Sequence, residues 1–192
     1  MTQSQFYKVK SAEQIDELYG VAESIITRSS ETTTSLIKRD GWTPICVQEN
    51  LLNVYEIAPI LKKYNYETII GLEWSRGDVE RSATTFDSTR DSMSRFISRQ
   101  WCSAYLLFSG SPDWVILVEK TLDFCFLYGE KKFLEELINT SQSEAFLSVE
   151  EMIAECQYFT DTGRQHLRDL LHELRDVYPT ILPGDTFSFE FT

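Results

Sequence analysis

Two nearly continuous apolar runs lie close together near the middle of this sequence. Residues 113–128 read DWVILVEKTLDFCFLY, and the apolar runs are Trp114–Val118 and Phe124–Tyr128. Such a run indicates a strand that is buried on both faces, because a strand with one face in water alternates apolar and polar residues. Either the rest of the chain or a partner must therefore cover both faces of these two strands.

The sequence around these runs predicts a three-stranded antiparallel meander over about residues 102–128. The segment from Cys102 to Phe108 is apolar, and Ser109–Asp113 (SGSPD) is a turn sequence. Strands follow at Trp114–Glu119 and Leu122–Tyr128, joined by Lys120 and Thr121. Short connections of this kind join antiparallel neighbours.

Segments with apolar residues at helical spacing occur on both sides of the meander in the sequence. A capping box at Ser11 and Gln14 precedes the first of them, and a second capping box is predicted at Ser148–Glu151. Pro59 is expected to break the helical pattern of residues 50–64 or to open a second helical piece. Helices are predicted at about residues 15–26 and 50–64, in the second half of the polar segment 79–100, and at about residues 130–138, 148–156 and 161–177.

Further strands are predicted at about residues 5–9, 42–47, 66–74 and, after a Pro-Gly-Asp turn, 186–192. The last of these is TFSFEFT, whose alternating phenylalanines indicate a half-buried strand at a sheet edge. Together the elements predict an α+β fold in a single globular domain, residues 1–192, with amphipathic helices covering the central sheet on one face or on both. The Trp114 and Phe124 runs are then core rather than a docking surface.

The charge of the chain restricts the classes of partner. Thirty acidic residues outweigh 18 basic ones, which gives a formal net charge of -12. Such a surface repels nucleic acid and anionic membranes, and it attracts basic proteins. No run approaches the ~18 apolar residues that a membrane span needs, and no apolar signal segment is found, so we expect a cytoplasmic protein.

No sequence motif predicts catalysis, a cofactor or a metal. The four cysteines are far apart in sequence and form no Cys-x-x-Cys pair, so they are expected to be free thiols. His166 and His172, six residues apart on one predicted helix, cannot share a metal. Asp161-Thr162-Gly163 matches the tripeptide of aspartic proteases, but the polar helix that follows makes a helix cap the better interpretation.

Negative charge is concentrated in one region of the sequence. Residues 130–155 contain seven glutamates and two lysines, whereas residues 76–99 contain five arginines and four acids. The arginine-rich segment is interpreted as an exposed helix with local ion pairs, Asp87 with Arg90 and Asp91 with Arg95. The residues predicted to contact a partner are Glu135, Glu136, Glu150, Glu151 and Glu155, together with any exposed tryptophan.

These features favour a non-enzymatic acidic protein that binds another, basic protein. In size, acidity and lack of catalytic motifs the chain resembles bacterial immunity proteins that neutralise toxins, a resemblance that implies an inhibitor function. One alternative is an enzyme with a dispersed site, such as Asp161, His166 or Glu173 with a divalent metal. Another is a structural subunit that pairs with a neighbour through the edge strand TFSFEFT.

Overall fold

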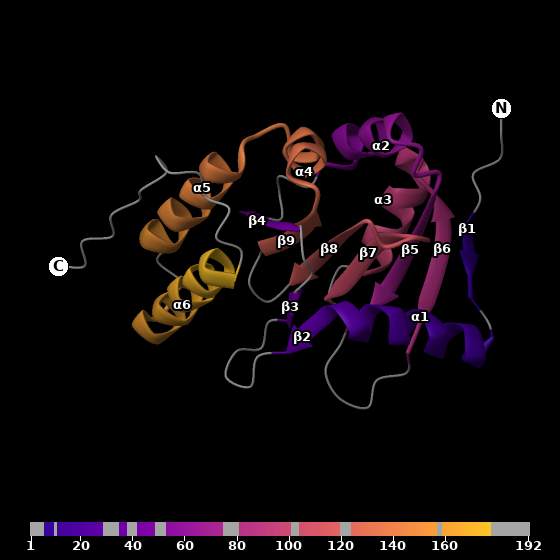
Figure 1. Cartoon of the computed structure of the whole chain (residues 1–192), viewed down its shortest axis with the longest axis horizontal. Helices are drawn as coiled ribbons and strands as arrows, with labels where there is room; N and C mark the ends of the chain where they lie inside the picture. Colours follow the sequence, from indigo (N-terminus) through magenta and orange to yellow (C-terminus); the bar gives the residue numbers. More distant parts are fainter. Residues whose placement is uncertain are drawn as a thin grey trace.

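The fold is built on one open antiparallel sheet of seven strands in the order β1-β6-β5-β7-β8-β9-β4 (Figure 1). The computed structural model describes residues 6–9, 11–28, 35–37, 42–48, 53–74, 81–100, 104–119, 124–156 and 159–177. Every pair of neighbouring strands in this sheet is antiparallel. The strands are β1 Phe6–Lys8, β4 Thr43–Gln48, β5 Thr68–Glu73, β6 Ala83–Asp87, β7 Tyr105–Ser109, β8 Trp114–Glu119 and β9 Phe124–Gly129.

Strands β7, β8 and β9 form the predicted meander at the centre of this sheet. In the register of β8 with β9, Val115 faces Tyr128 and Leu117 faces Phe126. Side chains throughout the two apolar runs are buried. The predicted antiparallel meander and the α+β class are therefore confirmed.

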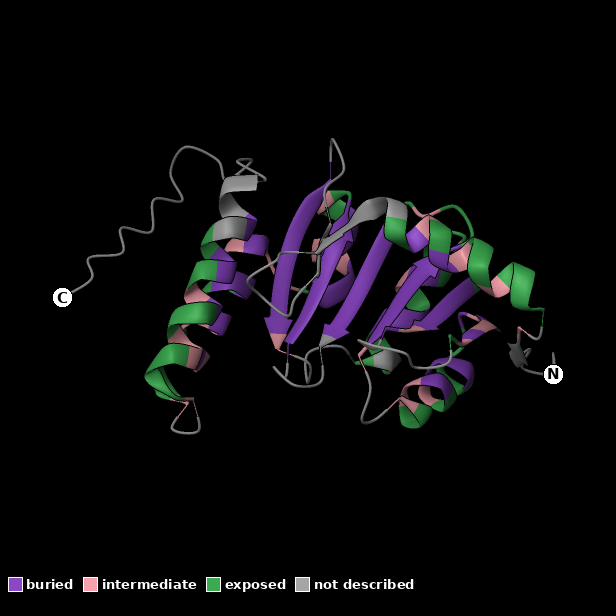
Figure 2. Cartoon of the chain, turned by 90° about the horizontal axis from the view of Figure 1, so that it is seen from below, coloured by how far each residue is buried: buried purple, intermediate pink, exposed green. Residues whose placement is uncertain are grey.

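Helices cover both faces of the sheet, and the chain itself thus buries the apolar runs. On one face, the buried cluster includes residues of α1 (Ala12–Ile25), α5 (Gln142–Glu155) and α6 (Asp161–Val177). On the other face, it includes residues of α2 (Val54–Lys63), α3 (Arg90–Arg99) and α4 (Lys131–Ile138), together with Ala145 of α5. Figure 2 shows the buried sides of the helices turned toward the sheet and the exposed sides turned away.

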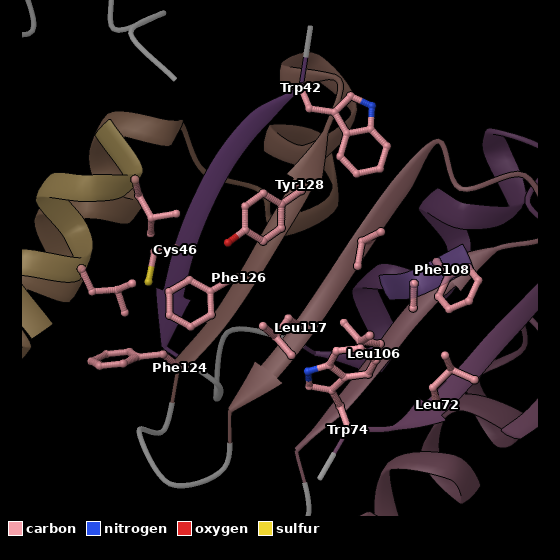
Figure 3. Packing of buried hydrophobic residues seen from close by; sticks show 14 of the residues in the cluster. Trp42, Cys46, Leu72, Trp74, Leu106, Phe108, Leu117, Phe124, Phe126 and Tyr128 are labelled. Atoms are coloured by element: carbon pink, nitrogen blue, oxygen red, sulfur yellow. The ribbon is translucent and has the colours of Figure 1, made fainter. Parts of the chain in front are cut away.

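The face covered by α1, α5 and α6 is rich in aromatic residues. Phe124, Phe126 and Tyr128 alternate along β9 and therefore stand on the same face, as Figure 3 shows. Cys46 of the edge strand β4 is buried beside them. Fully burying a side chain of this size contributes about 1.5–3 kcal/mol, so these residues are a major source of stability.

Strand β6 lies in a segment for which the sequence predicted only polar chain followed by a helix. It pairs with β5 on one side and with β1 on the other. The segment contains Thr84 and Thr85, which are half-buried, so it lacks the apolar pattern of the central strands. Its β-branched threonines were the available signal for a strand.

Helix α2 continues through Pro59, which contradicts the predicted break. The helix begins after Asn53, whose side chain accepts a hydrogen bond from the Tyr55 N–H, and it ends at Lys63. Proline removes one N–H and crowds the carbonyl group of the residue four positions earlier, here Tyr55. Pro59 and Tyr55 are both exposed, so water can solvate that carbonyl group while the opposite side of α2 stays packed.

Helix α5 begins six residues before the predicted capping box at Ser148. The observed capping box is formed by Ser141 and Glu144, and it follows directly on Asn139, which ends α4 in a left-handed conformation with φ of 52°. Asparagine tolerates this conformation better than most residues, which allows the tight turn between the two helices. The Ser148 signature lies inside a continuous helix and caps nothing.

Two short strands form a separate hairpin, and one predicted strand cannot be assessed. β2 (Ile26–Arg28) follows α1 without a break and pairs with β3 (Ser35–Ile37). The predicted helix therefore ends one residue early, at Ile25. The predicted strand TFSFEFT (residues 186–192) and the turn before it lie outside the described residues.

Candidate functional site

An exposed stripe of acidic and apolar residues runs along helix α5. Glu144, Leu147, Glu151, Ala154 and Glu155 are all exposed, whereas Ala145, Phe146, Val149 and Ile153 on the opposite side are buried. At 3.6 residues per turn, the five exposed positions fall within an arc of about 100°. We call these five residues the α5 stripe.

Leu147 gives the α5 stripe an apolar centre. Its side chain is 39% exposed, and among the described residues only Tyr55 is another large hydrophobic residue with comparable exposure. Glu144 lies three residues before Leu147 and Glu151 lies four residues after it, so both adjoin it on the helix surface. A lysine or arginine of a partner can pair its charged end with these carboxylates. The apolar stem of the same side chain can then contact the partially exposed leucine between them.

The capping box keeps one carboxylate of the α5 stripe in place. Glu144 accepts hydrogen bonds from the Ser141 hydroxyl group at 2.6 Å, the Ser141 N–H at 3.0 Å and the Thr140 hydroxyl group at 3.2 Å. The Ser141 hydroxyl group contributes most to lowering the pKa of Glu144, followed by the Ser141 N–H and Thr140. Glu144 is therefore held negatively charged at the start of the helix, where the helix dipole favours a negative charge.

The other two carboxylates of the α5 stripe lie where the helix dipole opposes them. Glu151 and Glu155 belong to the last two turns of α5, which has no basic residue in its last turn. Neither makes a hydrogen bond or an ion pair within the part of the chain that the structure describes. A negative charge at a helix C-terminus costs stability, so helix formation does not account for either residue.

Arg164 of α6 supplies the positive charge that the end of α5 lacks. Its guanidinium group donates to the carbonyl oxygens of Ile153 at 3.0 Å and Ala154 at 2.9 Å. These are unpaired carbonyl groups of the last helical turn, which cationic side chains commonly satisfy. This contact fixes the end of α5 against α6 and leaves the carboxylates of Glu151 and Glu155 exposed.

The five predicted contact residues lie in three different environments. Glu151 and Glu155 are exposed on the α5 stripe, whereas Glu150 is half-buried and has an interaction within the chain. Glu135 accepts a hydrogen bond from the Gln142 N–H at 2.9 Å and lies 3.9 Å from the Lys131 ammonium group. The structure therefore does not place all five on one free surface.

Glu136 joins helix α4 to helix α2. Its carboxylate accepts hydrogen bonds from the Lys63 ammonium group and, at 3.0 Å, from the Tyr64 hydroxyl group. Lys63 contributes most to lowering the pKa of Glu136, with Tyr64 second, because both donors stabilise the charged carboxylate. Glu136 thus has a structural contact that a partner would have to displace.

The tryptophans offer no exposed anchor among the described residues. Trp42, Trp74 and Trp114 are buried, and Trp101 lies outside the described residues. Leu147 was not among the contacts predicted from the sequence. The signal that could have found it is its spacing from Glu144 and Glu151, which becomes visible once α5 is known to begin at Gln142.

The residues of the alternative enzyme site do not converge in the described structure. Asp161, His166 and His172 are exposed on α6, and the side chain of Glu173 lies outside the described residues. The hydroxyl oxygen of Thr160, rather than a side chain of Asp161 or Thr162, accepts a hydrogen bond from the N–H of Gly163 in the first turn of α6, at 3.1 Å. Within the described residues no group of three histidine, cysteine, aspartate or glutamate side chains is placed to hold a metal ion.

Comparisons with other proteins provide no relative from which a function could be inferred. No protein-family model matches the chain, and no curated protein or solved structure matches it either. In the described part of the chain, none of the helices has both the length and the apolar character needed to cross a membrane.

Proposed function

We propose that this chain is a non-enzymatic binding protein that holds a basic protein partner on the α5 stripe. The observation that carries the proposal is the combination of Glu151 and Glu155, exposed and without a described partner, with the exposed Leu147 beside them. Opposite charges at an interface speed association and fix orientation, while a central apolar side chain contributes contact area.

The net charge of the whole chain supports the same kind of partner. At -12, the chain attracts a basic protein from a distance, and the α5 stripe is one place where exposed carboxylates are concentrated. An inhibitor or immunity-type role follows if the bound surface of the partner is its active site. Carboxylates can occupy sites that bind phosphate groups, so a basic nuclease is the kind of target that we expect.

We place this activity in the cytoplasm as part of the same proposal. Cys46, Cys125 and Cys156 are free thiols in the described structure, and Cys46 and Cys125 are buried. A reducing compartment preserves free thiols of this kind. Thiol chemistry is compatible with this location but does not select a partner.

Charge reversal on the α5 stripe tests the proposed function. The purified chain, carrying an affinity tag, is incubated with a lysate of its native cells, and the bound proteins are quantified by mass spectrometry at low and high salt. We expect a basic protein that the wild type retains at low salt, that high salt releases, and that the Glu151→Lys/Glu155→Lys variant does not retain. Leu147→Asp should also lose this protein, because it removes the apolar contact.

A matched control separates the α5 stripe from the overall charge. Glu17→Lys/Glu67→Lys changes the net charge by the same amount at two exposed positions outside α5. This control should retain the partner, with slower association at most. If both double variants lose the same protein equally, or if neither loses any, the α5 stripe is not the binding surface.

A further inference from the structure

A pocket of about 440 Å³ lies between helix α2 and the beginning of helix α3. It is lined by Ala58, Pro59 and Lys62 of α2 and by Ser88, Thr89, Arg90 and Asp91 at the start of α3. The pocket is shallow and widely open to solvent. None of the residues that line the pocket belongs to α5, so the pocket is separate from the α5 stripe; Figure 1 shows α4 between α5 and α2.

Ser88 is a largely buried polar residue whose side chain has no hydrogen-bond partner among the residues that the structure describes. The residue is only 8% exposed, and its hydroxyl group makes no hydrogen bond within the described structure. The Ser88 N–H continues the ladder of β6 by donating to the Glu67 carbonyl oxygen at 3.0 Å. Ser88 directly follows β6 (Ala83–Asp87) and lines the pocket between α2 and α3.

The first turn of α3 presents further donors to the pocket. Thr89 caps the helix, and its hydroxyl oxygen accepts from the Ser92 N–H at 3.3 Å. The N–H groups of Arg90 and Asp91 have no acceptor in the described part of the chain. Unpaired N–H groups and the positive end of the helix dipole together favour an anion at this position.

Two cationic side chains border the same pocket. The Arg90 guanidinium group lies over the ring of Tyr55, 5.4 Å from its centroid, instead of making the expected ion pair with Asp87. Lys62 has no ion pair within the described structure either. Both cations are thus available to an anion, in a protein that is strongly acidic as a whole.

Two carboxylates limit the charge that the pocket can accept. Asp91 lines it, and Asp87 accepts a hydrogen bond from the Thr89 hydroxyl group at 2.7 Å. A doubly charged phosphate group would be repelled by both, whereas a singly charged group is repelled less. Ala58 and Pro59 offer apolar surface beside the donors.

We propose that this pocket binds a small monocarboxylate. The carboxylate accepts hydrogen bonds from the Ser88 hydroxyl group and from the N–H groups at the start of α3, and it pairs with Lys62 or Arg90. The apolar body of the ligand lies against Ala58 and Pro59. The ligand thus supplies an acceptor that the Ser88 hydroxyl group lacks within the described structure.

Titration of the full-length ¹⁵N-labelled chain with sodium benzoate tests this site. We expect saturable amide shifts concentrated at residues 88–92, with sodium chloride at equal ionic strength producing none that saturate. Inorganic phosphate should bind more weakly than benzoate because of Asp87 and Asp91. Absence of saturable shifts at these residues, or tighter binding of phosphate than of benzoate, would overturn the proposal.

The Ser88→Ala variant tests whether the Ser88 hydroxyl group contacts the bound carboxylate. Because this hydroxyl group has no partner in the described part of the chain, alanine should preserve the native spectrum while weakening benzoate binding by about tenfold, through loss of a hydrogen bond to a charged group. Ser98→Ala is the matched control, since that hydroxyl group donates to the Ser94 carbonyl oxygen at the other end of α3. Equal affinities of the two variants would contradict the role of Ser88.

Lys62→Gln and Lys132→Gln make a second matched pair. Lys62 lines the pocket, whereas Lys132 is exposed on α4 and does not. Only Lys62→Gln should weaken benzoate binding if the anion occupies the pocket. Equal weakening by both variants would indicate attraction by overall charge and would reject the site.

Discussion

The side-chain amide nitrogen of Gln142, Nε2, donates a hydrogen bond to the carbonyl oxygen of Pro44 over 2.8 Å, and this buried contact joins the first residue of α5 to the edge strand β4. Pro44 pairs with Tyr128 of β9 on the other side of the strand. An unpaired carbonyl group at a sheet edge can recruit another strand, and proteins commonly cover such edges. Gln142 satisfies this carbonyl group and holds α5 against β4.

Gln142→Leu should lower the free energy of unfolding by about 1–3 kcal/mol, because it leaves the buried Pro44 carbonyl oxygen without its donor. Urea unfolding followed by tryptophan fluorescence measures the change. Gln165→Leu is the control, since Gln165 makes an exposed side-chain hydrogen bond with Asp169. We expect a change of less than about 0.5 kcal/mol for the control, as is usual at surface positions. Equal effects of the two substitutions would contradict a stabilising role for the Gln142 contact.

Gly71 and Gly20 should respond to alanine in opposite directions. A Cβ atom on Gly71 of β5 would lie 2.4 Å from two ring carbons of Phe96, whereas a Cβ atom on Gly20 of α1 would meet nothing within 4 Å. Phe96 is buried between Phe86 and Tyr105 and has little room to move. We expect Gly71→Ala to destabilise the fold by about 1–3 kcal/mol through overpacking. We expect Gly20→Ala to stabilise it by about 0.5–1 kcal/mol through helix propensity.

Thermal unfolding of both alanine variants checks this contrast. Adding Phe96→Leu to Gly71→Ala should recover part of the lost stability if the clash with the ring is the cause, since neighbouring substitutions are not additive. A Gly71→Ala variant with wild-type stability would show that the Phe96 ring can shift at no cost.

Features encoded by local sequence could be predicted, and features that depend on distant contacts could not. The strand at Trp114–Glu119 and the helix at Asp161–Val177 follow from apolar runs and helical spacing, and the structure has them at the predicted bounds. The order of the strands depends on pairing between residues that are distant in sequence. Examples are β5 next to β7, and β4 at the edge of the sheet beside β9. Strand β6 was missed for a related reason, because its place between β5 and β1 rather than its composition makes it a strand.

The candidate sites show the same limit. A cluster of glutamates was visible in the sequence, but Glu136 contacts Lys63 and Tyr64, which are more than 70 positions away and could not be anticipated. The α2–α3 pocket likewise joins Lys62 to Ser88 through the fold alone.

Acid should weaken two glutamate contacts that hold helices in place. Hydrogen bonds from Lys63 and Tyr64 lower the pKa of Glu136, and those from Ser141 and Thr140 lower the pKa of Glu144, each from the ordinary value of 4.5. A lowered pKa in the folded state means that the unfolded chain binds protons first as the pH falls. The stabilisation is therefore fully present above about pH 5 and is lost as the pH falls through the lowered pKa values.

Stability curves between pH 7 and pH 3 measure this loss. Glu136→Gln and Glu144→Gln should be less stable than the wild type at pH 7, and the difference should shrink as the pH falls. Glu17→Gln, at an exposed position on α1, is the matched control. A difference from the wild type that stays constant down to pH 3 would show that the charge of these glutamates is not what stabilises the fold.

The cysteines should differ sharply in reactivity. Cys46 and Cys125 are buried in the sheet, and Cys156 is partly exposed where α5 ends. Burial raises the pKa of the Cys46 thiol far above its ordinary value, because the interior cannot solvate a thiolate. The thiolate is the reactive form. Cys46 is therefore protected twice, because burial keeps the reagent out and the raised pKa keeps the thiol protonated. Iodoacetamide labelling followed by peptide mapping should therefore modify Cys156 in the native protein and leave Cys46 and Cys125 unmodified.

In increasing urea, Cys46 and Cys125 should become reactive together with the loss of the tryptophan signal, because both lie in the central sheet. Labelling of Cys46 at the rate of Cys156 in native buffer would mean that β4 separates from β9 without global unfolding, and α5 would then not protect that edge of the sheet.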